Sequence, residues 1–201
     1  FVVPNPVDIG EFSHLPEFGR FRAAYSIGEQ ARIVLFLGRI EARKGIDLTL
    51  QGFAKIKSVH PESRLVLAGP QEDGYLNIVT EMAKSLDILD QIITPGYLDA
   101  RQRLEAIVDA DVFILTSYSE NFGMAVVEAM AGELPVLISD RVGIADDVLF
   151  SGAGVVTSLN PEEIGKGLIY LLSSDEHRKE MGCNGRQAAQ KYWPQNIAET
   201  I

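Results

Sequence analysis

A chain of 201 residues, 46% hydrophobic and 23% charged, can bury one substantial core and has the composition of a globular domain. Its formal net charge of -10 excludes a general attraction to nucleic acid or to an anionic membrane surface. A single cysteine excludes an internal disulfide, no apolar run approaches the roughly 20 residues that span a bilayer, and no signal peptide is recognisable, so we expect a cytoplasmic protein.

Apolar runs alternate with amphipathic stretches along most of the chain. After an opening through residue 24 that we expect to be irregular, the predicted strands cover residues 33–37, 65–68, 91–94, 112–115, 136–138 and 154–156. The predicted helices cover residues 45–59, 74–85, 101–110, 122–131, 161–172 and 175–191. Continuously apolar strands that alternate with helices predict an α/β fold, a doubly wound, Rossmann-like parallel sheet of about six strands.

The two ends of the chain are expected to lead away from this domain. The sequence begins without methionine, inside an apolar run that ends in a turn, as a piece of a longer protein would. We assign residues 1–24 to an interdomain segment and residues 25–191 to the Rossmann-like domain. Residues 192–201 form a C-terminal segment that is too apolar for a free end, so we expect it to pack on another part of the protein.

The loops that follow the predicted strands are the place to look for a ligand, because open α/β sheets bind ligands beyond the carboxyl ends of their strands. Most of these loops carry a glycine directly after the strand, where the backbone turns sharply or approaches a ligand closely. Any strand-to-helix loop can contain a glycine, so each one alone is weak evidence. Together they predict a single site on one rim of the sheet.

The first of these loops, residues 38–45, places three cations between a buried strand and the next helix. Arg39 offers a planar fork of donors and Lys44 a point charge, a combination that suits a diphosphate. Arg43 is interpreted instead as a solvated surface charge.

A second loop, residues 117–123, leads into a helix that is small and apolar apart from Glu128. A buried carboxylate needs a hydrogen-bonding partner, and a ribose diol would supply two hydroxyl donors. The free amides at the start of this helix are placed to face a phosphate or sugar oxygen, and Glu120 to accept hydrogen bonds from sugar hydroxyls. The alternative interpretation makes Glu120 a favourable charge near the helix start and Glu128 a member of a core ion pair.

Glu120 and Glu128 stand in an E-x7-E arrangement within SYSENFGMAVVEAMAGELPVLIS, which closely resembles the signature of retaining GT-B glycosyltransferases of the GT4 type. The resemblance covers nearly the whole chain. VVPNPVD, LFLGRIEARKGIDLTLQGF, RLVLAGP, the PGYL loop and MGCNGRQAAQKYW match the family in order. Several ordered motifs are far more specific than E-x7-E alone.

The resemblance implies a role for each matching residue. Arg39 and Lys44 would bind the donor diphosphate and stabilise the charge that grows on it as the glycosidic bond breaks. Glu120 would hold the transferred sugar together with the neighbouring amides, Glu128 would hold the ribose, and residues 96–98 would lie against the base. The implied substrate-binding residues are Gly38, Arg39, Lys44, Gly96, Tyr97, Leu98, Glu120, Asn121, Phe122, Gly123, Met124 and Glu128, and the implied catalytic residues are Glu120, Arg39 and Lys44.

The family also implies the partners of this domain. The donor would be a UDP-, GDP- or ADP-sugar, the reaction would retain anomeric configuration, and neither a metal nor another cofactor is expected. The scattered histidines, which have no metal-ligand spacing, agree with that expectation. An N-terminal domain of the same protein would bind the acceptor, provide any peripheral membrane contact and receive the C-terminal segment, so this domain alone would not turn over.

One loop departs from the family pattern, and other functions stay open. Where a double glycine and a glutamate are common after the fifth strand, this chain has RVGIADD at residues 141–147. A non-catalytic sugar-nucleotide sensor would keep the pocket without chemistry. A sugar-nucleotide epimerase is disfavoured by the ordered GR-x4-KG and E-x7-E motifs. A flavodoxin-like or response-regulator module is disfavoured because this chain lacks the acidic cluster of such modules. A dinucleotide site is disfavoured because no G-x-G-x-x-G follows the first strand.

Overall fold

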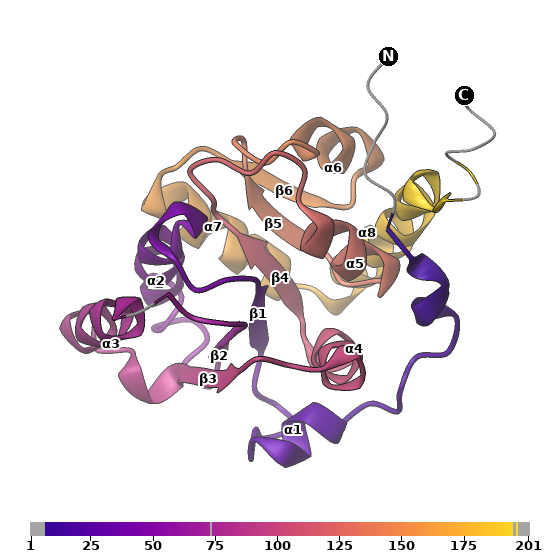
Figure 1. Cartoon of the computed structure of the whole chain (residues 1–201). Helices are drawn as coiled ribbons and strands as arrows, with labels where there is room; N and C mark the ends of the chain where they lie inside the picture. Colours follow the sequence, from indigo (N-terminus) through magenta and orange to yellow (C-terminus); the bar gives the residue numbers. More distant parts are fainter. Residues whose placement is uncertain (1–6, 73, 195, 197–201) are drawn as a thin grey trace.

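The computed structural model describes residues 7–72, 74–194 and 196 (Figure 1). Within these residues the chain forms a six-stranded sheet with the strand order β3-β2-β1-β4-β5-β6. Every pair of neighbouring strands is parallel. The predicted doubly wound α/β fold is therefore confirmed. In this part of the chain no helix is long and apolar enough to cross a membrane.

Each predicted strand overlaps an observed one. The strands are β1 (Ile33–Leu37), β2 (Arg64–Ala68), β3 (Ile92–Gly96), β4 (Val112–Leu115), β5 (Val136–Ser139) and β6 (Gly154–Thr157). The α-helices are α1 (Arg20–Ala24), α2 (Ile46–Ala54), α3 (Tyr75–Ser85), α4 (Ala100–Asp109), α5 (Met124–Ala131), α6 (Ala145–Ser151), α7 (Pro161–Leu172) and α8 (Asp175–Ala189). Short 3-10 helices are η1 (Ile9–Ser13), η2 (Ala42–Lys44), η3 (Leu89–Gln91) and η4 (Gln190–Tyr192).

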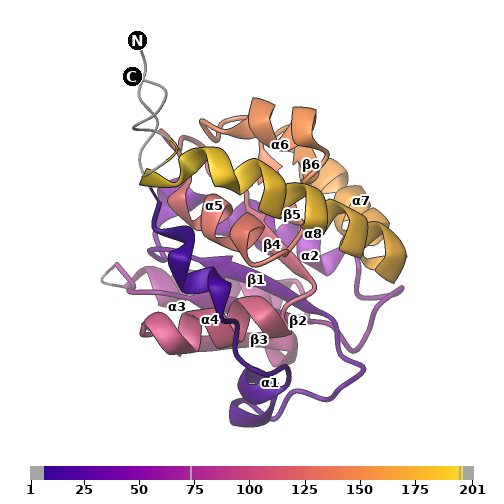
Figure 2. The same cartoon turned by 90° about the vertical axis from the view of Figure 1, so that its right-hand side faces the viewer.

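The sheet lies between two layers of helices. Helices α2, α3 and α7 cover one face, and α4, α5 and α8 cover the other (Figure 2). Strands β1, β4 and β5 are buried along their whole length, as their uninterrupted apolar sequences require. The strand order reverses between β1 and β4, which pair with Val34 opposite Val112. A crevice at the carboxyl ends of these two strands is the expected ligand site.

Several helices are shorter than predicted. The helix expected over residues 45–59 ends at Ala54, and the chain continues in turns with i→i+3 hydrogen bonds while Ile56 stays buried. The helix expected from residue 122 begins at Met124, because Gly123 takes a left-handed conformation with φ 103°. The last predicted helix ends at Ala189, where a 3-10 turn takes over. Apolar periodicity continues through such turns, so it does not mark the ends.

The helical elements that were not predicted include η1, α1 and α6. The opening through residue 24 is not irregular, since it contains η1 and α1, and α6 follows β5. These helices are five, five and seven residues long, too short for a periodic apolar pattern. Within α6 only Val148 is buried, so its sequence resembles that of a loop.

The described parts of both predicted interdomain segments pack into this domain. Val7, Phe12 and Phe21 belong to the hydrophobic core, and so does Tyr192. The amide of Val7 donates to the carbonyl of Tyr192 at 2.9 Å, so the described start of the chain lies beside η4. The core therefore extends across both predicted boundaries. That the chain continues from here to another domain stays a prediction, and most of the C-terminal segment lies outside the described residues.

The carboxylate of Asp109, at the end of α4, holds α1 in place. Asp109 is 1% exposed, and its two oxygens accept hydrogen bonds from the amides of Gly19 at 2.6 Å and Arg22 at 2.8 Å. The Arg22 guanidinium donates to the carbonyls of Ala31 at 2.7 Å and Asp109 at 2.9 Å. Free amides at a helix start need such an acceptor when they are shielded from water.

We expect Asp109→Ala to lower the free energy of unfolding by about 3 kcal/mol. The substitution removes the buried carboxylate and leaves the amides of Gly19 and Arg22 without their acceptor. Urea denaturation measures this change. Asp90→Ala, which removes an exposed carboxylate from η3, should change it by less than about 0.5 kcal/mol. Equal stability of the two variants would show that Asp109 does not anchor the opening segment.

Candidate functional site

Two adjoining cavities open at the carboxyl ends of β1 and β4. The larger has a volume of about 470 Å³ and extends toward α4, while the smaller has about 260 Å³ and lies against the loop before α5. Leu37 and Gly38, at the end of β1, and Met124 and Ala125, at the start of α5, line both. The hollow thus lies at the reversal of strand order, where the fold predicts it.

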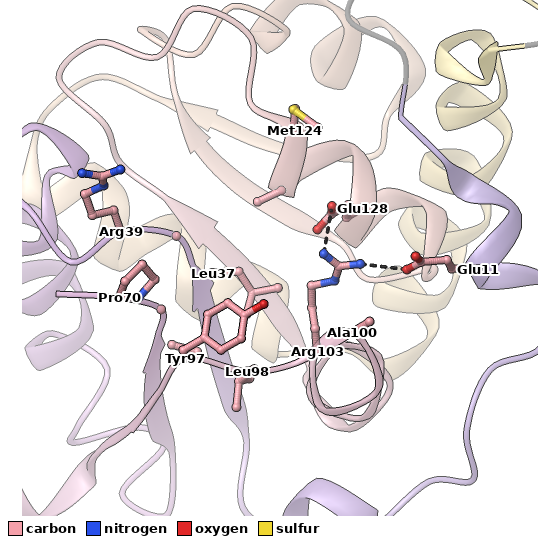
Figure 3. Close-up of a pocket in the computed structure, with 14 residues that line it drawn as sticks. Glu11, Leu37, Arg39, Pro70, Tyr97, Leu98, Ala100, Arg103, Met124 and Glu128 are labelled. Carbon is pink, nitrogen blue, oxygen red and sulfur yellow. Dashed lines mark hydrogen bonds and ion pairs between the residues drawn. The ribbon is translucent and has the colours of Figure 1, made fainter.

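The predicted site residues come together here with one exception. Among them, the larger cavity is lined by Gly38, Arg39, Tyr97, Leu98, Met124 and Glu128 (Figure 3). The smaller cavity is lined by Gly38, Lys44, Glu120, Asn121, Phe122, Gly123 and Met124. Gly96 lies outside both linings, at the end of β3, where its carbonyl accepts a hydrogen bond from the amide of Gly69 at 2.8 Å.

Lys44 and Glu120 form an ion pair in the smaller cavity. Lys44 ends η2, and Gly45 follows it with φ 66°. A side chain at Gly45 would place its Cβ 2.0 Å from the carbonyl oxygen of Thr116, so only glycine lets the first loop lie against the end of β4. The Thr116 hydroxyl donates to the Gly45 carbonyl at 2.8 Å. This close packing brings the cation to the carboxylate 76 residues away in sequence.

The loop that departs from the family pattern fixes the backbone of Glu120. The amide of Glu120 donates to the carbonyl of Arg141 at 3.1 Å, and the amide of Gly143 donates back to the carbonyl of Glu120 at 2.8 Å. A Cβ on Gly143 would lie 2.0 Å from the carbonyl oxygen of Asn121. The residues RVG therefore serve as a backbone support for the second loop.

The start of α5 presents unused amides to the cavities. The carbonyl of Gly123 accepts a hydrogen bond from the amide of Val126 at 2.9 Å, and no side chain caps the helix. Within the described part of the chain, the amides of Met124 and Ala125 donate to no protein group. Free amides at a helix N-terminus attract anionic oxygens.

Arg39 lies in the loop that directly follows β1 and is the most accessible cation of the site. Its side chain is 67% exposed, and its Nε lies 3.8 Å from the Glu41 carboxylate. In Figure 3 its guanidinium lies at the opposite end of the larger cavity from Glu128. A ligand that lies along this cavity would therefore meet a cation at one end and a carboxylate at the other.

Glu128 is not the lone carboxylate that its sequence context suggests. Its Oε1 lies 3.4 Å from Nη1 of Arg103 on α4, and Nη2 of Arg103 donates to Glu11 of η1 at 2.8 Å (Figure 3). The ion-pair alternative is thus observed, although the Glu128 side chain, 15% exposed, still lines the cavity. Burial raises the pKa of Glu128, the charge of Arg103 lowers it, and that of Glu11 raises it, with a net upward shift.

The sequence profile of the family described as Glycosyl transferases group 1 matches residues 17–188. The chain belongs to this family. It is 28% identical over 197 residues to the mannosylfructose-phosphate synthase of Agrobacterium fabrum, covering 94% of this chain and 43% of that protein. The chain spans about half the length of the relatives that it matches.

Solved structures show the same fold. HepE of Anabaena, solved in complex with UDP and glucose, aligns with a TM-score of 0.87 at 20% identity. The alignment covers 100% of this chain and 56% of the HepE chain. The C-terminal domain of LpcC, a glycosyl transferase group 1 family protein of Francisella tularensis, aligns with a TM-score of 0.82 at 21% identity, over 94% of this chain and 100% of its own. At such identities the likeness shows the fold alone, that of GT-B glycosyltransferases.

Two residues of this group 1 domain, Arg103 and Glu11, escaped the sequence analysis. Arg103 lies in a predicted helix, but the pattern of that helix does not tell which cation faces the crevice. Glu11 lies in the opening that was expected to be irregular. Among the described residues, no group of three or more histidine, cysteine, aspartate or glutamate side chains could hold a metal ion, and metal independence of the group 1 reaction stays a prediction.

Tyr118 ties the second loop of the group 1 domain to the first. Its hydroxyl donates to Asp47 Oδ2 at 2.6 Å, and its amide donates to the carbonyl of Arg43 at 3.0 Å. The hydrogen bond to Asp47 raises the pKa of Tyr118 to about 12. The bond stabilises the protonated phenol, and together the two bonds link the segment that carries Lys44 to the loop that carries Glu120.

We expect the stabilisation from Tyr118 to be complete below pH 10 and to be lost as the pH rises to about 12, because the folded pKa lies above the ordinary value of 10.0. A pH titration followed by the ultraviolet absorbance of phenolate measures the pKa. Subtracting the titration of Tyr118→Phe from that of the unaltered chain gives the contribution of Tyr118 alone. In an Asp47→Ala background its pKa should fall toward 10.0. A titration that is the same with and without Asp47 would contradict the assignment.

Proposed function

We propose that this chain is the donor-binding, C-terminal half of a retaining, GT4-type glycosyltransferase. The whole protein would move a sugar from a nucleotide-diphosphate sugar to a glycan, lipid or small-molecule acceptor. The observation that carries the proposal is the convergence of Arg39, Lys44, Glu120 and Glu128 on two adjoining cavities at the reversal of strand order. Membership of the group 1 family supports sugar transfer as the reaction.

The diphosphate would lie over Gly38, between Arg39 and the free amides of α5. Lys44 is paired with Glu120 in the structure. An entering diphosphate brings more than one negative charge, so it competes with Glu120 for the ammonium group. The Glu120 carboxylate is then free to accept hydrogen bonds from hydroxyls of the transferred sugar. The cations that bind the ground state are also placed to stabilise the departing nucleotide diphosphate.

The nucleoside would occupy the larger cavity. Glu128, the second glutamate of the E-x7-E motif, lines this cavity and would accept hydrogen bonds from the two hydroxyls of the ribose. The exposed ring of Tyr97 and the neighbouring Leu98 would lie against the base. The base identity is left to the binding experiment below, since UDP, GDP and ADP share the ribose and the diphosphate, and a contact with the face of a base does not distinguish one base from another.

The acceptor site would come from a preceding half of the protein. The chain spans 56% of HepE, and Val7 and Tyr192, which lie far apart in sequence, are hydrogen-bonded to each other. We propose that an N-terminal domain docks over the crevice, supplies the acceptor site and any peripheral membrane contact, and completes a cytoplasmic, metal-independent enzyme. The single, exposed Cys183 suits that reducing compartment.

Titration calorimetry with UDP, GDP and ADP, with and without a divalent metal ion, tests the donor site. We expect one of them to bind without metal, and Arg39→Ala/Lys44→Ala to weaken that binding by about 100-fold or more, because two charge-assisted contacts are lost. Arg43→Ala removes an exposed cation from the same loop and should change affinity by less than about threefold. Equal losses in both variants, or no binding to a folded sample, would contradict the proposal.

Glu128→Ala should reduce nucleotide-diphosphate affinity by about 100-fold and leave the free energy of unfolding within about 1 kcal/mol. The fold tolerates this change because burial already disfavours the charged carboxylate and Arg103 keeps its bond to Glu11. Calorimetry and urea denaturation measure the two effects, with Glu180→Ala on α8 as the control. Unchanged affinity in Glu128→Ala would rule out the ribose assignment.

A further inference from the structure

A chain of three charges links the larger cavity to the opening segment of the domain. Arg103, on α4, lies between Glu128 of α5 and Glu11 of η1, and all three line the cavity (Figure 3). Its contact with Glu11 is the closer, a hydrogen bond of 2.8 Å, while Glu128 lies at 3.4 Å. One guanidinium therefore serves two carboxylates, and the cluster carries a net charge of -1.

The packing around Arg103 limits its choice of partners. Its Nε is buried and has no hydrogen-bond partner among the described residues, so its two terminal nitrogens carry its polar contacts. The charged groups that face Glu128 are Arg103 and Glu11. They act in opposite directions, since a nearby cation favours the charged carboxylate and a nearby anion disfavours it.

The segment that carries Glu11 is packed on the same helix as Glu128. Phe12, next to Glu11, is buried in the core and lies beside Gly132 at the end of α5. The amide of Val7 is bonded to the carbonyl of Tyr192. A shift of residues 7–13 would therefore change the distance from Glu11 to Arg103, and with it the share of the guanidinium that Glu128 receives.

We infer that Arg103 is a positioning residue that holds the Glu128 carboxylate in its charged, ribose-binding form. Glu11 competes with Glu128 for the Arg103 guanidinium. The position of the segment 7–13 therefore sets the affinity of the site for the nucleotide. This inference rests on the proposed donor function. A charged carboxylate accepts hydrogen bonds from both hydroxyls of a diol, whereas a protonated carboxyl group has fewer acceptor positions. Docking or release of the opening segment would thereby be transmitted to the nucleotide across a single side chain.

Carbon-13 NMR titration of the Glu128 carboxyl group tests the electrostatic part directly and needs no ligand. We expect the pKa of Glu128 to rise in Arg103→Met, to return toward the unaltered value in Arg103→Lys, and to fall in Glu11→Gln. Arg101→Met removes an exposed arginine of the same helix that pairs with Glu105, and it should leave the titration unchanged. A Glu128 titration that is the same in Arg103→Met and Arg101→Met would overturn the inference.

Calorimetry with UDP, GDP and ADP across a range of pH tests the consequence for binding. In Arg103→Met the affinity should fall with decreasing pH, by up to about tenfold per pH unit, and the fall should begin at a higher pH than in the unaltered chain. Glu11→Gln should shift the onset to lower pH. An equal loss at every pH would overturn the inference and make Arg103 a direct contact. Absence of binding by the unaltered chain would refute the donor function, while the NMR titration still decides whether Arg103 and Glu11 control Glu128.

Discussion

The parallel pairing of β1 with β4 creates the crevice around which the candidate site is built. These strands are neighbours in the sheet although β2 and β3 lie between them in sequence. The chain leaves β1 toward α2 on one face and leaves β4 toward α5 on the other, so the loops diverge and a crevice forms between them. Gly45 closes that arrangement against Thr116, because any larger residue would separate the two loops and their charges.

Charge compensation is the second theme of the site. Lys44 is paired with Glu120, and Arg103 is shared by Glu128 and Glu11, so these partly buried charges have partners within the domain. Unpaired charges in such a crevice would be costly in free energy. In the proposed function, binding is an exchange of partners, in which a diphosphate would displace one carboxylate and ribose hydroxyls would satisfy another. Arg39, which is largely exposed, is available without such an exchange.

The ends of the chain are part of the domain and also connect to the site. Phe12, Phe21 and Tyr192 share the core with the sheet, and the Tyr192 ring packs edge-on against Phe122 in the second loop. Its hydroxyl donates to Asp147, and burial, followed by this hydrogen bond, raises the pKa of Tyr192. Glu11 in η1 and Tyr192 in η4 thus contact residues that line the crevice, Arg103 and Phe122, which gives a physical path from these two segments to the candidate site.

The sequence by itself determined the six strands, the parallel α/β architecture and the rim loops with Gly38, Arg39 and the E-x7-E motif. Apolar runs, helix periodicity and loop glycines are local signals, and the alternation of buried strands with helices indicates a parallel sheet. The family resemblance then assigned roles along those loops. Short elements such as α6 escaped, because one buried residue makes no period.

Only the tertiary structure decided which charges meet. Glu11 and Arg103 are separated by 92 residues, and Lys44 and Glu120 by 76, so their contacts depend on strand order, loop packing and the face that each helix turns to the crevice. The same holds for the support that Gly143 gives to Glu120. Side-chain contacts between distant segments are fixed by how close-packed layers fit together, and no local pattern in the sequence encodes that fit.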